Sequence, residues 1–394
     1  MSNDRKIKGQ KIHVLTLTPF YPSRKDERGG FVAEPLTEFG ALGLESSVIA
    51  VRVLHKSRVL PSTTSPAATW VRYPVWPGNR GLASSGHALF SRIRGMVRRL
   101  HQERRIDVLH AHAPLPCGEA ARLLSEDLGI PFVVTVHGLD AYFTEQIGGR
   151  AGERCGKLCR QVYEQAARVI CISEHVRQRV LERMPDFKKT EVVENGVDAG
   201  MFSPAKEVPS GQCIASVGSL IAIKGHDVTL RALRELKNEF ADLRCRIVGE
   251  GVELGRLQGL ARELGIAERE EFLGRRTRIE VAELLRESMV FALPSRYEGL
   301  GCVYLEAMAT GIPAIACRGQ GIGEVIRDGE NGFLIAEQDW RGLAGLLRTL
   351  IQRPELRHAI GVAARKTIVG EGLSGFTLLH QAKGLQSIYR DCRA

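Results

Sequence analysis

One stretch near residue 300 fixes a local fold that the rest of the chain must accommodate. Residues 289–294, MVFALP, form an apolar run typical of a buried strand. A glycine-containing loop follows at 295–301, and LEAMA at 305–309 favours a helix that a glycine and a proline end. A second apolar run, IPAIAC, occupies 312–317. The order predicts a strand, loop, helix, strand unit with glycines at the start of its helix.

The start of this helix has the character of an anion site with a carboxylate on either side. Free backbone N–H groups and the helix dipole favour a phosphate there. Glu298 precedes the helix and Glu306 lies within it, eight residues later, so both can face one pocket. Two carboxylates suit hydroxyl-rich groups beside a phosphate, such as a sugar and a ribose. From spacing alone, two solvated glutamates on an amphipathic helix are equally consistent.

The full stretch, PSRYEGLGCVYLEAMATGIPAIA, resembles the donor-site signature of the retaining glycosyltransferases of family 4, which have the GT-B fold. The resemblance implies that Glu298 hydrogen-bonds the donor sugar and that Glu306 binds the ribose hydroxyls. It also implies that the backbone between them holds the diphosphate, through Gly299, Leu300, Gly301, Cys302 and Val303.

Repeated strand–helix units in each half predict an α/β protein with two doubly wound, Rossmann-like parallel sheets. The resemblance adds that two such domains face a cleft in the GT-B fold. Residues 1–198 are expected to form an N-terminal acceptor-side domain, and 199–372 a donor-binding domain. ENGVD followed by FSP resembles the hinge between them, at 195–205. The final helix, in 373–394, is expected to cross back to the first domain.

The first half offers weaker candidates. Gly29 and Gly30 follow the first strand in a dinucleotide-like arrangement that is more often a plain turn. The resemblance makes both of them candidates for approach to the donor phosphate or the acceptor. His137 follows the strand PFVVTV, where a histidine often only caps a strand, but the resemblance places it at the sugar end of the donor site. Asp140 lies within reach of the same pocket, and Ser173 is a minor candidate.

The second half contains a cation in a position suited to phosphate. Lys224 follows the strand CIASVGS and precedes a helix, beside a glycine. In the resembled family this lysine holds the donor diphosphate. Many members carry Gly-Arg where this chain has Gly218 and Ser219. Either Lys224 suffices, or a second cation such as Arg296 or Arg318 supplements it.

Two further turns resemble nucleotide-contacting turns of the family. Gly249 and Glu250 form one of them, and the backbone around Arg275 and Arg276 is the other, where the base is read. Because backbone groups would read the base, the side chains do not identify it. A UDP- or GDP-linked sugar is the expected donor.

Neither metal nor cofactor is expected. The chain has no D-x-D motif, and its nine cysteines are scattered singly, as buried reduced thiols usually are. Cys155 and Cys159 have helical spacing, but no nearby histidine or cysteine completes a metal set. His110 and His112 stand at a strand end without a third ligand that the sequence can place.

The positive charge is concentrated in the first half. Lysines and arginines exceed carboxylates by eight in residues 1–198 and by two in the remainder. Such a face suits nucleic acid, anionic lipid or a phosphorylated substrate. The basic helix at 88–105 could lie on a membrane, although packing of its apolar stripe on the sheet is the favoured interpretation. No run of about 18 apolar residues and no apolar signal core occurs, so a cytoplasmic protein is expected.

Together these features predict a retaining hexosyltransferase that moves a sugar from a nucleoside diphosphate sugar to an acceptor hydroxyl. His137, Lys224 and Glu298 are the catalytic candidates. The expected acceptor is a lipid-linked or saccharide precursor of bacterial exopolysaccharide, capsule or lipopolysaccharide, with peripheral contact to the inner membrane face and no nucleic acid. A GT-B sugar-nucleotide isomerase of the 2-epimerase type and a non-catalytic sugar-nucleotide-binding protein are the alternatives. The glutamate signature argues against the first, and retention of the main site residues argues against the second.

Overall fold

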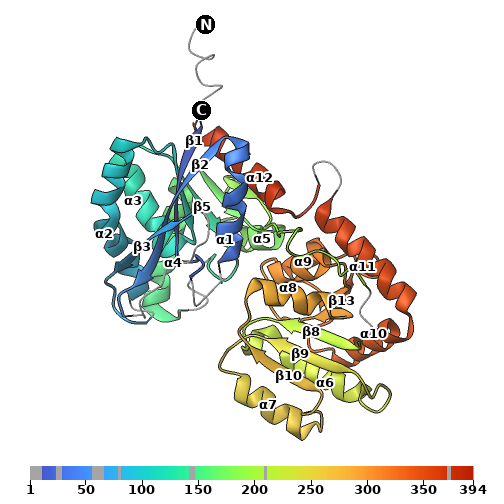
Figure 1. The fold of residues 1–394 in the computed structure, drawn as a ribbon. Helices are drawn as coiled ribbons and strands as arrows, with labels where there is room; N and C mark the ends of the chain where they lie inside the picture. The colour runs from blue at the N-terminus through green and yellow to red at the C-terminus, as the bar shows by residue number, and fades with distance from the viewer. Residues whose placement is uncertain are drawn as a thin grey trace. The chain divides into compact units, whose positions relative to one another are not determined.

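The chain forms two compact units, each an α/β domain with one parallel sheet (Figure 1). Unit 1 comprises Met1–Asn195 and Leu378–Ala394, and unit 2 comprises Gly196–Thr377. The sequence-based division fell after residue 198, and the returning segment was expected to start at 373. The computed structural model describes residues 11–23, 29–55, 66–78, 81–141, 147–207, 211–370 and 374–393.

In the described part of unit 1, the sheet has seven parallel strands in the order β3-β2-β1-β4-β5-β6-β7. Its central strands are mostly apolar, and every residue of β1 and β5 is buried, as expected where helices cover both faces. The strands are β1 Ile12–Thr18, β2 Leu44–Val53, β3 Ala68–Tyr73, β4 Val108–His112, β5 Phe132–Val136, β6 Arg168–Cys171 and β7 Thr190–Val192.

Among the described residues, six α-helices accompany this sheet. They are α1 Gly30–Ala33, α2 Leu82–Glu103, α3 Glu119–Leu128, α4 Gly149–Gln165, α5 Glu174–Arg183 and α12 Leu378–Arg393. Short helical turns lie at Glu34–Glu38, Gly40–Leu42 and Pro114–Gly118. The last helix, α12, buries Ala382, Leu385, Ile388 and Tyr389 in the unit 1 core, although the whole of unit 2 precedes it in the chain.

The basic helix α2 packs its apolar stripe inward. Ile93 and Val97 are fully buried within unit 1. Two of its arginines are committed to the protein itself, because Arg94 and Arg98 both hydrogen-bond the carboxylate of Asp127, which precedes the end of α3. The apolar stripe of the basic helix predicted at residues 88–105 is therefore packed inside unit 1, as the favoured interpretation expects.

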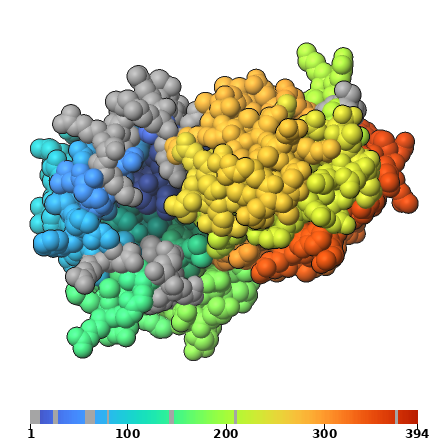
Figure 2. All heavy atoms as spheres, turned by 90° about the horizontal axis from the view of Figure 1, so that it is seen from below, coloured from blue at the N-terminus to red at the C-terminus, as the bar shows by residue number. Residues whose placement is uncertain are grey.

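The sheet formed by the described residues of unit 2 has six parallel strands in the order β10-β9-β8-β11-β12-β13. Figure 2 shows the outer surface of this unit, where residues coloured yellow to orange by the bar are exposed. The strands are β8 Cys213–Val217, β9 Arg244–Val248, β10 Glu270–Gly274, β11 Val290–Ala292, β12 Ala314–Cys317 and β13 Phe333–Ile335. The helices are α6 His226–Leu236, α7 Leu254–Glu263, α8 Arg278–Arg286, α9 Cys302–Ala309, α10 Trp340–Gln352 and α11 Pro354–Val369, with short turns at Ala222–Lys224 and Gly321–Glu324.

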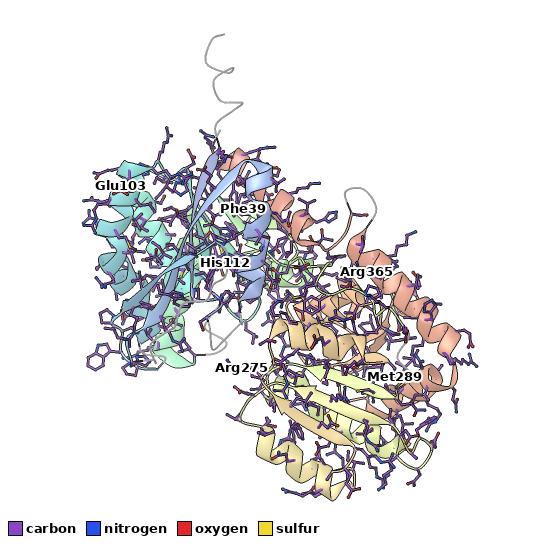
Figure 3. All side chains as sticks on the ribbon, in the orientation of Figure 1. Phe39, Glu103, His112, Arg275, Met289 and Arg365 are labelled. Atoms are coloured by element: carbon purple, nitrogen blue, oxygen red, sulfur yellow. The ribbon has the colours of Figure 1, made fainter. Side chains whose placement is uncertain are left out.

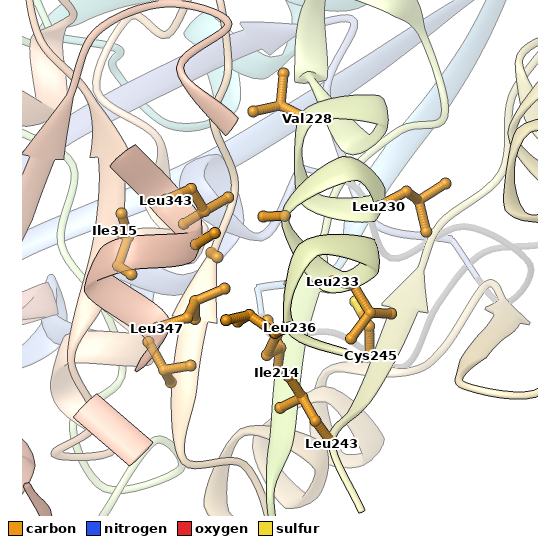
Figure 4. Packing of buried hydrophobic residues seen from close by; sticks show 14 of the residues in the cluster. Ile214, Val228, Leu230, Leu233, Leu236, Leu243, Cys245, Ile315, Leu343 and Leu347 are labelled. Atoms are coloured by element: carbon orange, nitrogen blue, oxygen red, sulfur yellow. The ribbon is translucent and has the colours of Figure 1, made fainter. Parts of the chain in front are cut away.

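The core of unit 2 explains why these helices form. Leu233 and Leu236 recur at helical spacing on α6, and Leu343 and Leu347 do so on α10, so each helix presents one apolar face (Figure 4). These faces meet strand residues such as Ile214 in one buried cluster. Full burial of each leucine contributes roughly 1.5–3 kcal/mol before the loss of conformational entropy is subtracted.

The strand order indicates where each unit is expected to bind a ligand. In each sheet the winding reverses beside the first strand, between β1 and β4 in unit 1 and between β8 and β11 in unit 2. Ligands of doubly wound sheets bind outside the carboxyl ends of the strands at such a reversal. The predicted doubly wound parallel sheets are therefore confirmed, and each has one defined edge at which to look for a site.

Candidate functional site

In unit 2, the loops after β8 and β11 bring a lysine and a glutamate into contact. Lys224 ends a short helical turn directly before α6, and its Nζ lies 2.5 Å from Oε1 of Glu298. Ser295 donates a hydrogen bond to the same oxygen at 3.0 Å. The Lys224 side chain is 21% exposed and that of Glu298 is 9% exposed. The structure therefore joins two of the three residues that the sequence analysis named as catalytic candidates, as a partly buried ion pair.

Backbone contacts hold this glutamate in place. Arg296 donates its N–H to the carbonyl of Ile223 at 2.8 Å, which ties the β11 loop to the Lys224 turn. The N–H of Glu298 donates to Oε1 of Gln320, and the carbonyl of Glu298 accepts from Gly321. Sequence reasoning missed Gln320, since nothing in the local pattern links the loop after β12 to the loop after β11.

The predicted diphosphate segment forms the amino end of α9. Gly301 precedes the helix with φ +81°, a conformation that favours glycine. The predicted contacts of Gly299, Leu300, Gly301, Cys302 and Val303 therefore lie where the amides and the dipole of α9 attract an anion. Leu300 has no exposed surface, so its side chain packs in the core.

The second glutamate is also paired with a cation. Glu306 is buried in α9, and its Oε1 lies 2.7 Å from Nη1 of Arg278, the first residue of α8. The guanidinium of Arg278 lies over the ring of Phe202, with 5.0 Å to the ring centroid. Sequence reasoning missed Arg278. Each of the two predicted glutamates thus has its own cation.

The turn after β9 is a close backbone crossing. Gly249 has φ +147°, and a Cβ there would lie 1.9 Å from the carbonyl oxygen of Gly218. The neighbouring Glu250 pairs with Arg275 at 2.8 Å, and both side chains are solvent-exposed (Figure 3). Such an exposed pair contributes little to stability. The close backbone crossing therefore requires a glycine at position 249, independently of any ligand that binds beside it.

The structure distinguishes between Arg296 and Arg318, the two cations that could supplement Lys224 because this chain has Ser219 in place of an arginine. Arg318 is exposed and already pairs with Asp328. Arg296 has a buried Nε with no hydrogen-bond partner among the described residues. Of the two, Arg296 is the cation with unused hydrogen-bonding capacity beside the Lys224 turn. Next to that turn, burial lowers the pKa of His226 to about 4, so its ring adds no charge at neutral pH.

In unit 1, three histidines form a row at the carboxyl ends of β4 and β5. The ring centroids of His110 and His112 are 4.4 Å apart, and those of His112 and His137 are 5.2 Å apart. His112 Nδ1 and His137 Nε2 share a hydrogen bond of 3.0 Å. At the other end of the row, Nδ1 of His110 forms a hydrogen bond with the hydroxyl of Tyr389 at 2.6 Å, and Nε2 forms one with the hydroxyl of Thr135 at 2.7 Å. His112 points into the interior of unit 1 (Figure 3).

Burial keeps this row uncharged. It lowers the pKa of His110 and of His137 to about 3, and that of His112 well below its ordinary value. A small cavity runs along the row, lined also by Phe31 and Gln381. The row can therefore donate and accept hydrogen bonds at pH 7 but does not attract anions.

The remaining candidates of unit 1 are largely accounted for by the fold. Asp140 accepts the N–H of His137 at 2.8 Å, and burial raises the pKa of this carboxyl to about 7. Ser173 is buried and caps α5 by accepting the N–H of Val176, a sufficient structural reason for a serine there. Gly29 has φ +107° and Gly30 begins the four-residue α1. A Cβ on Gly29 would lie 2.8 Å from the Phe20–Tyr21 backbone, so close packing requires this glycine.

Within the described part of the chain, no group of three histidine, cysteine or carboxylate side chains could hold a metal ion. All nine cysteines are free thiols, and seven of them are buried. None of the described helices is both long and apolar enough to cross a membrane.

Comparison with known proteins agrees with this arrangement. A family model described as Glycosyltransferase Family 4 matches residues 30–200, and one described as Glycosyl transferases group 1 matches residues 203–367. The D-inositol 3-phosphate glycosyltransferase of Corynebacterium urealyticum is 30% identical over 309 residues, covering 72% of this chain and 71% of that protein. The chain belongs to glycosyltransferase family 4.

Solved structures show the fold of this family 4 glycosyltransferase to be GT-B. Sucrose-phosphate synthase from Thermosynechococcus elongatus matches with a TM-score of 0.79 at 20% identity, covering 96% of this chain and 98% of that one. Anabaena HepE in complex with UDP-glucose matches with a TM-score of 0.72 at 16% identity, covering 96% and 100%. The predictions of family and fold are thereby confirmed.

Proposed function

We propose that this glycosyltransferase moves a hexosyl group from a nucleoside diphosphate sugar to an acceptor hydroxyl, with retention of the anomeric configuration. The contact of Lys224 with Glu298 beside the amino end of α9 carries the proposal. It combines a phosphate-binding cation with a carboxylate suited to sugar hydroxyls. The UDP-glucose complex of a protein with the same fold supports a nucleotide-sugar donor.

Donor binding would exchange partners at this pair. Lys224 would transfer its hydrogen bond from Glu298 to an oxygen of the diphosphate, and the helix amides would bind the same group. Glu298 would then accept hydrogen bonds from the donor sugar. As the bond to the diphosphate breaks, the prepositioned cation and amides would stabilise the negative charge that develops on the leaving group.

The other unit 2 contacts would hold the nucleoside. Glu306 would accept hydrogen bonds from the ribose hydroxyls, with Arg278 orienting the carboxylate. The backbone beside Arg275 would meet the base, and Gly249 and Glu250 would border the nucleotide. In unit 1, the uncharged ring of His137 would hydrogen-bond a hydroxyl of the sugar.

The proposed acceptor is a lipid-linked or saccharide precursor of a bacterial surface polysaccharide, with unit 1 on the acceptor side. The positive excess of residues 1–198 supports peripheral contact with an anionic membrane surface from the cytoplasm. Since the apolar stripe of α2 is buried, this contact would use exposed basic side chains. Protein that stays unbound to anionic vesicles at low salt would contradict this part of the proposal.

A ligand panel followed by product analysis tests the central proposal. Thermal unfolding is measured with UDP, GDP and ADP and their glucose conjugates, each with and without EDTA. A ligand at a hundred times its Kd should stabilise the protein by about 2.7 kcal/mol. The stabilising sugar nucleotide is then incubated with candidate acceptors, and NMR of the product shows the anomeric configuration. Inversion would refute retention, and stabilisation by none of these ligands would contradict the donor site.

A further inference from the structure

The His112–His137 contact places two uncharged imidazoles nitrogen to nitrogen. One hydrogen must lie between His112 Nδ1 and His137 Nε2, which are 3.0 Å apart. Whichever ring supplies that hydrogen, the partner nitrogen must be unprotonated for the bond to form. The contact therefore couples the tautomers of the two rings. It also fixes the plane of the His137 ring, since a hydrogen bond to an imidazole is directional.

The opposite nitrogen of His137 lacks a protein partner. His137 Nδ1 is buried, and no described residue hydrogen-bonds it. Two phenylalanine rings, Phe20 and Phe31, also lie beside the His137 ring, with centroids at 5.5 and 4.9 Å, and their side chains offer no hydrogen bond. Buried polar atoms without a partner are rare and point to a missing ligand or water.

We propose that His112 is a positioning residue, which fixes the tautomer and ring plane of His137 so that His137 Nδ1 meets a sugar hydroxyl. The inference deepens the proposed function and rests on it for the identity of the ligand. A hydroxyl is the fitting chemistry because it can both donate and accept. An uncharged ring next to phenylalanines gives no advantage to an anionic group.

The rest of the row explains how His112 stays in place. His110 stacks on it at 4.4 Å, and both nitrogens of His110 are anchored by hydroxyl groups. One of these hydroxyls belongs to Tyr389 of α12, 279 positions away in the sequence. The row is thus fixed at the His110 end and has its unpartnered nitrogen at the His137 end.

A simpler explanation is that His112 is a buried histidine with a structural role alone. Unit 1 contains such a residue for comparison. His13 is also buried, and its Nδ1 and Nε2 contact the carbonyl of Arg105 and the hydroxyl of Ser47. Loss of either imidazole ring should destabilise unit 1, but only loss of the His112 ring should change the tautomer and ring plane of His137. His13 therefore provides the matched control.

The test compares His112→Asn, His112→Leu and His13→Leu. An asparagine amide can occupy the position of the His112 Nδ1 group, whereas leucine keeps bulk and removes the hydrogen bond. With the donor identified by the ligand panel, we expect His112→Leu to lower kcat roughly 10–100-fold with little change in donor KM, by analogy with residues that orient ligand histidines. His112→Asn should recover most of the loss, and His13→Leu should keep the wild-type kcat.

A second readout does not depend on activity. In histidine labelled with ¹⁵N, wild-type His137 should show one tautomer, and His112→Leu should give a mixture. A wild-type kcat with an unchanged His137 tautomer in His112→Leu would overturn the proposal. If His112→Leu does not fold, a wild-type-like tautomer in His112→Asn supports the proposal, and a mixture overturns it. If His137→Ala retains full activity, the proposed role of His137 fails instead, and the NMR result still decides whether His112 sets the tautomer.

Discussion

The carboxyl ends of the two sheets both lie where the winding reverses, but one gathers charged side chains and the other neutral ones. In unit 2 the loops gather ion pairs, Lys224 with Glu298 and Arg278 with Glu306. In unit 1 the corresponding edge gathers histidines that burial keeps neutral. The contrast matches what each edge is proposed to bind, because a diphosphate needs cations and sugar hydroxyls do not. One α/β plan can thus provide two kinds of ligand site through the loops that follow its strands.

The two sites also differ in whether their polar groups already have a partner within the protein. The unit 2 carboxylates are already occupied by cations, so a ligand must displace one of these contacts. Breaking a partly buried pair leaves a charge unsatisfied unless the ligand replaces it. In unit 1, by contrast, no described residue hydrogen-bonds Nδ1 of His137, so a hydroxyl that reached this buried atom would not have to replace a hydrogen bond from those residues.

Removing the unit 2 cation should have the largest effect. Lys224→Met leaves Glu298 without its cation, and it removes the cation proposed to bind the diphosphate, so kcat/KM should fall roughly 1,000-fold. Lys206→Met, at an exposed lysine of the same unit, is the matched control and should behave as wild type. Steady-state kinetics with the identified donor decide the matter. A loss below tenfold would mean that charge at this edge does not drive the reaction.

Removing the two ring nitrogens of His137 in unit 1 should have the second largest effect. His137→Phe keeps an aromatic ring and loses both hydrogen-bonding atoms, and we expect kcat to fall roughly 100-fold. Since no charge is lost, the ratio of wild-type to variant kcat should stay constant between low and high salt. A ratio that shrinks as salt rises would show that the His137 ring acts as a cation, contrary to the neutral row.

The histidine row should also make the protein sensitive to acid. The pKa of His110 is about 3 in the folded state and 6.5 ordinarily, so the unfolded chain binds more protons between these values. The free energy of unfolding therefore falls as the pH is lowered through this window. From pH 7.5 to pH 5, His110 alone should account for about 2 kcal/mol. Urea unfolding at both pH values should show a smaller difference in His110→Asn, and an unchanged difference would refute the pKa assignment.

The smallest effect should come from the second ion pair. Arg278→Met removes the cation of Glu306 without touching the diphosphate contacts, so the donor KM should rise roughly tenfold at nearly constant kcat. Arg278→Lys keeps the charge but not the planar guanidinium, and it should recover part of the loss. A lower kcat with unchanged KM would mean that Glu306 acts in the chemical step instead of in ribose binding.

The parts of the site that could be predicted are those encoded within a few residues. The strand, loop and helix around Glu298 and the lysine at the start of α6 each have a local pattern with one physical meaning. The predicted final helix, in 373–394, also matches an observed one, α12. Both sheets followed from repeated strand–helix units, because parallel strands require crossover helices.

The parts that could not be predicted depend on partners far apart in the sequence. Arg278 lies 28 positions from Glu306, and Gln320 lies 22 positions from Glu298, with no local pattern joining them. The histidine row is a different case. His112 and His137 each end a strand, and the carboxyl ends of neighbouring parallel strands meet at one edge. That rule would have predicted their contact if the pairing of β4 with β5 had been known.

The return of α12 to unit 1 has a consequence for how the protein is made. A ribosome releases the strands of unit 1 first, but the helix that carries Leu385 and Tyr389 into their core emerges only after all of unit 2. At about 5–20 residues per second, the nascent unit 1 waits roughly 10–40 s with this part of its apolar core open. Unit 2, whose sheet and helices are continuous in the chain, can finish folding before the unit that precedes it. Chaperones that bind apolar surface would therefore meet this chain through its first half.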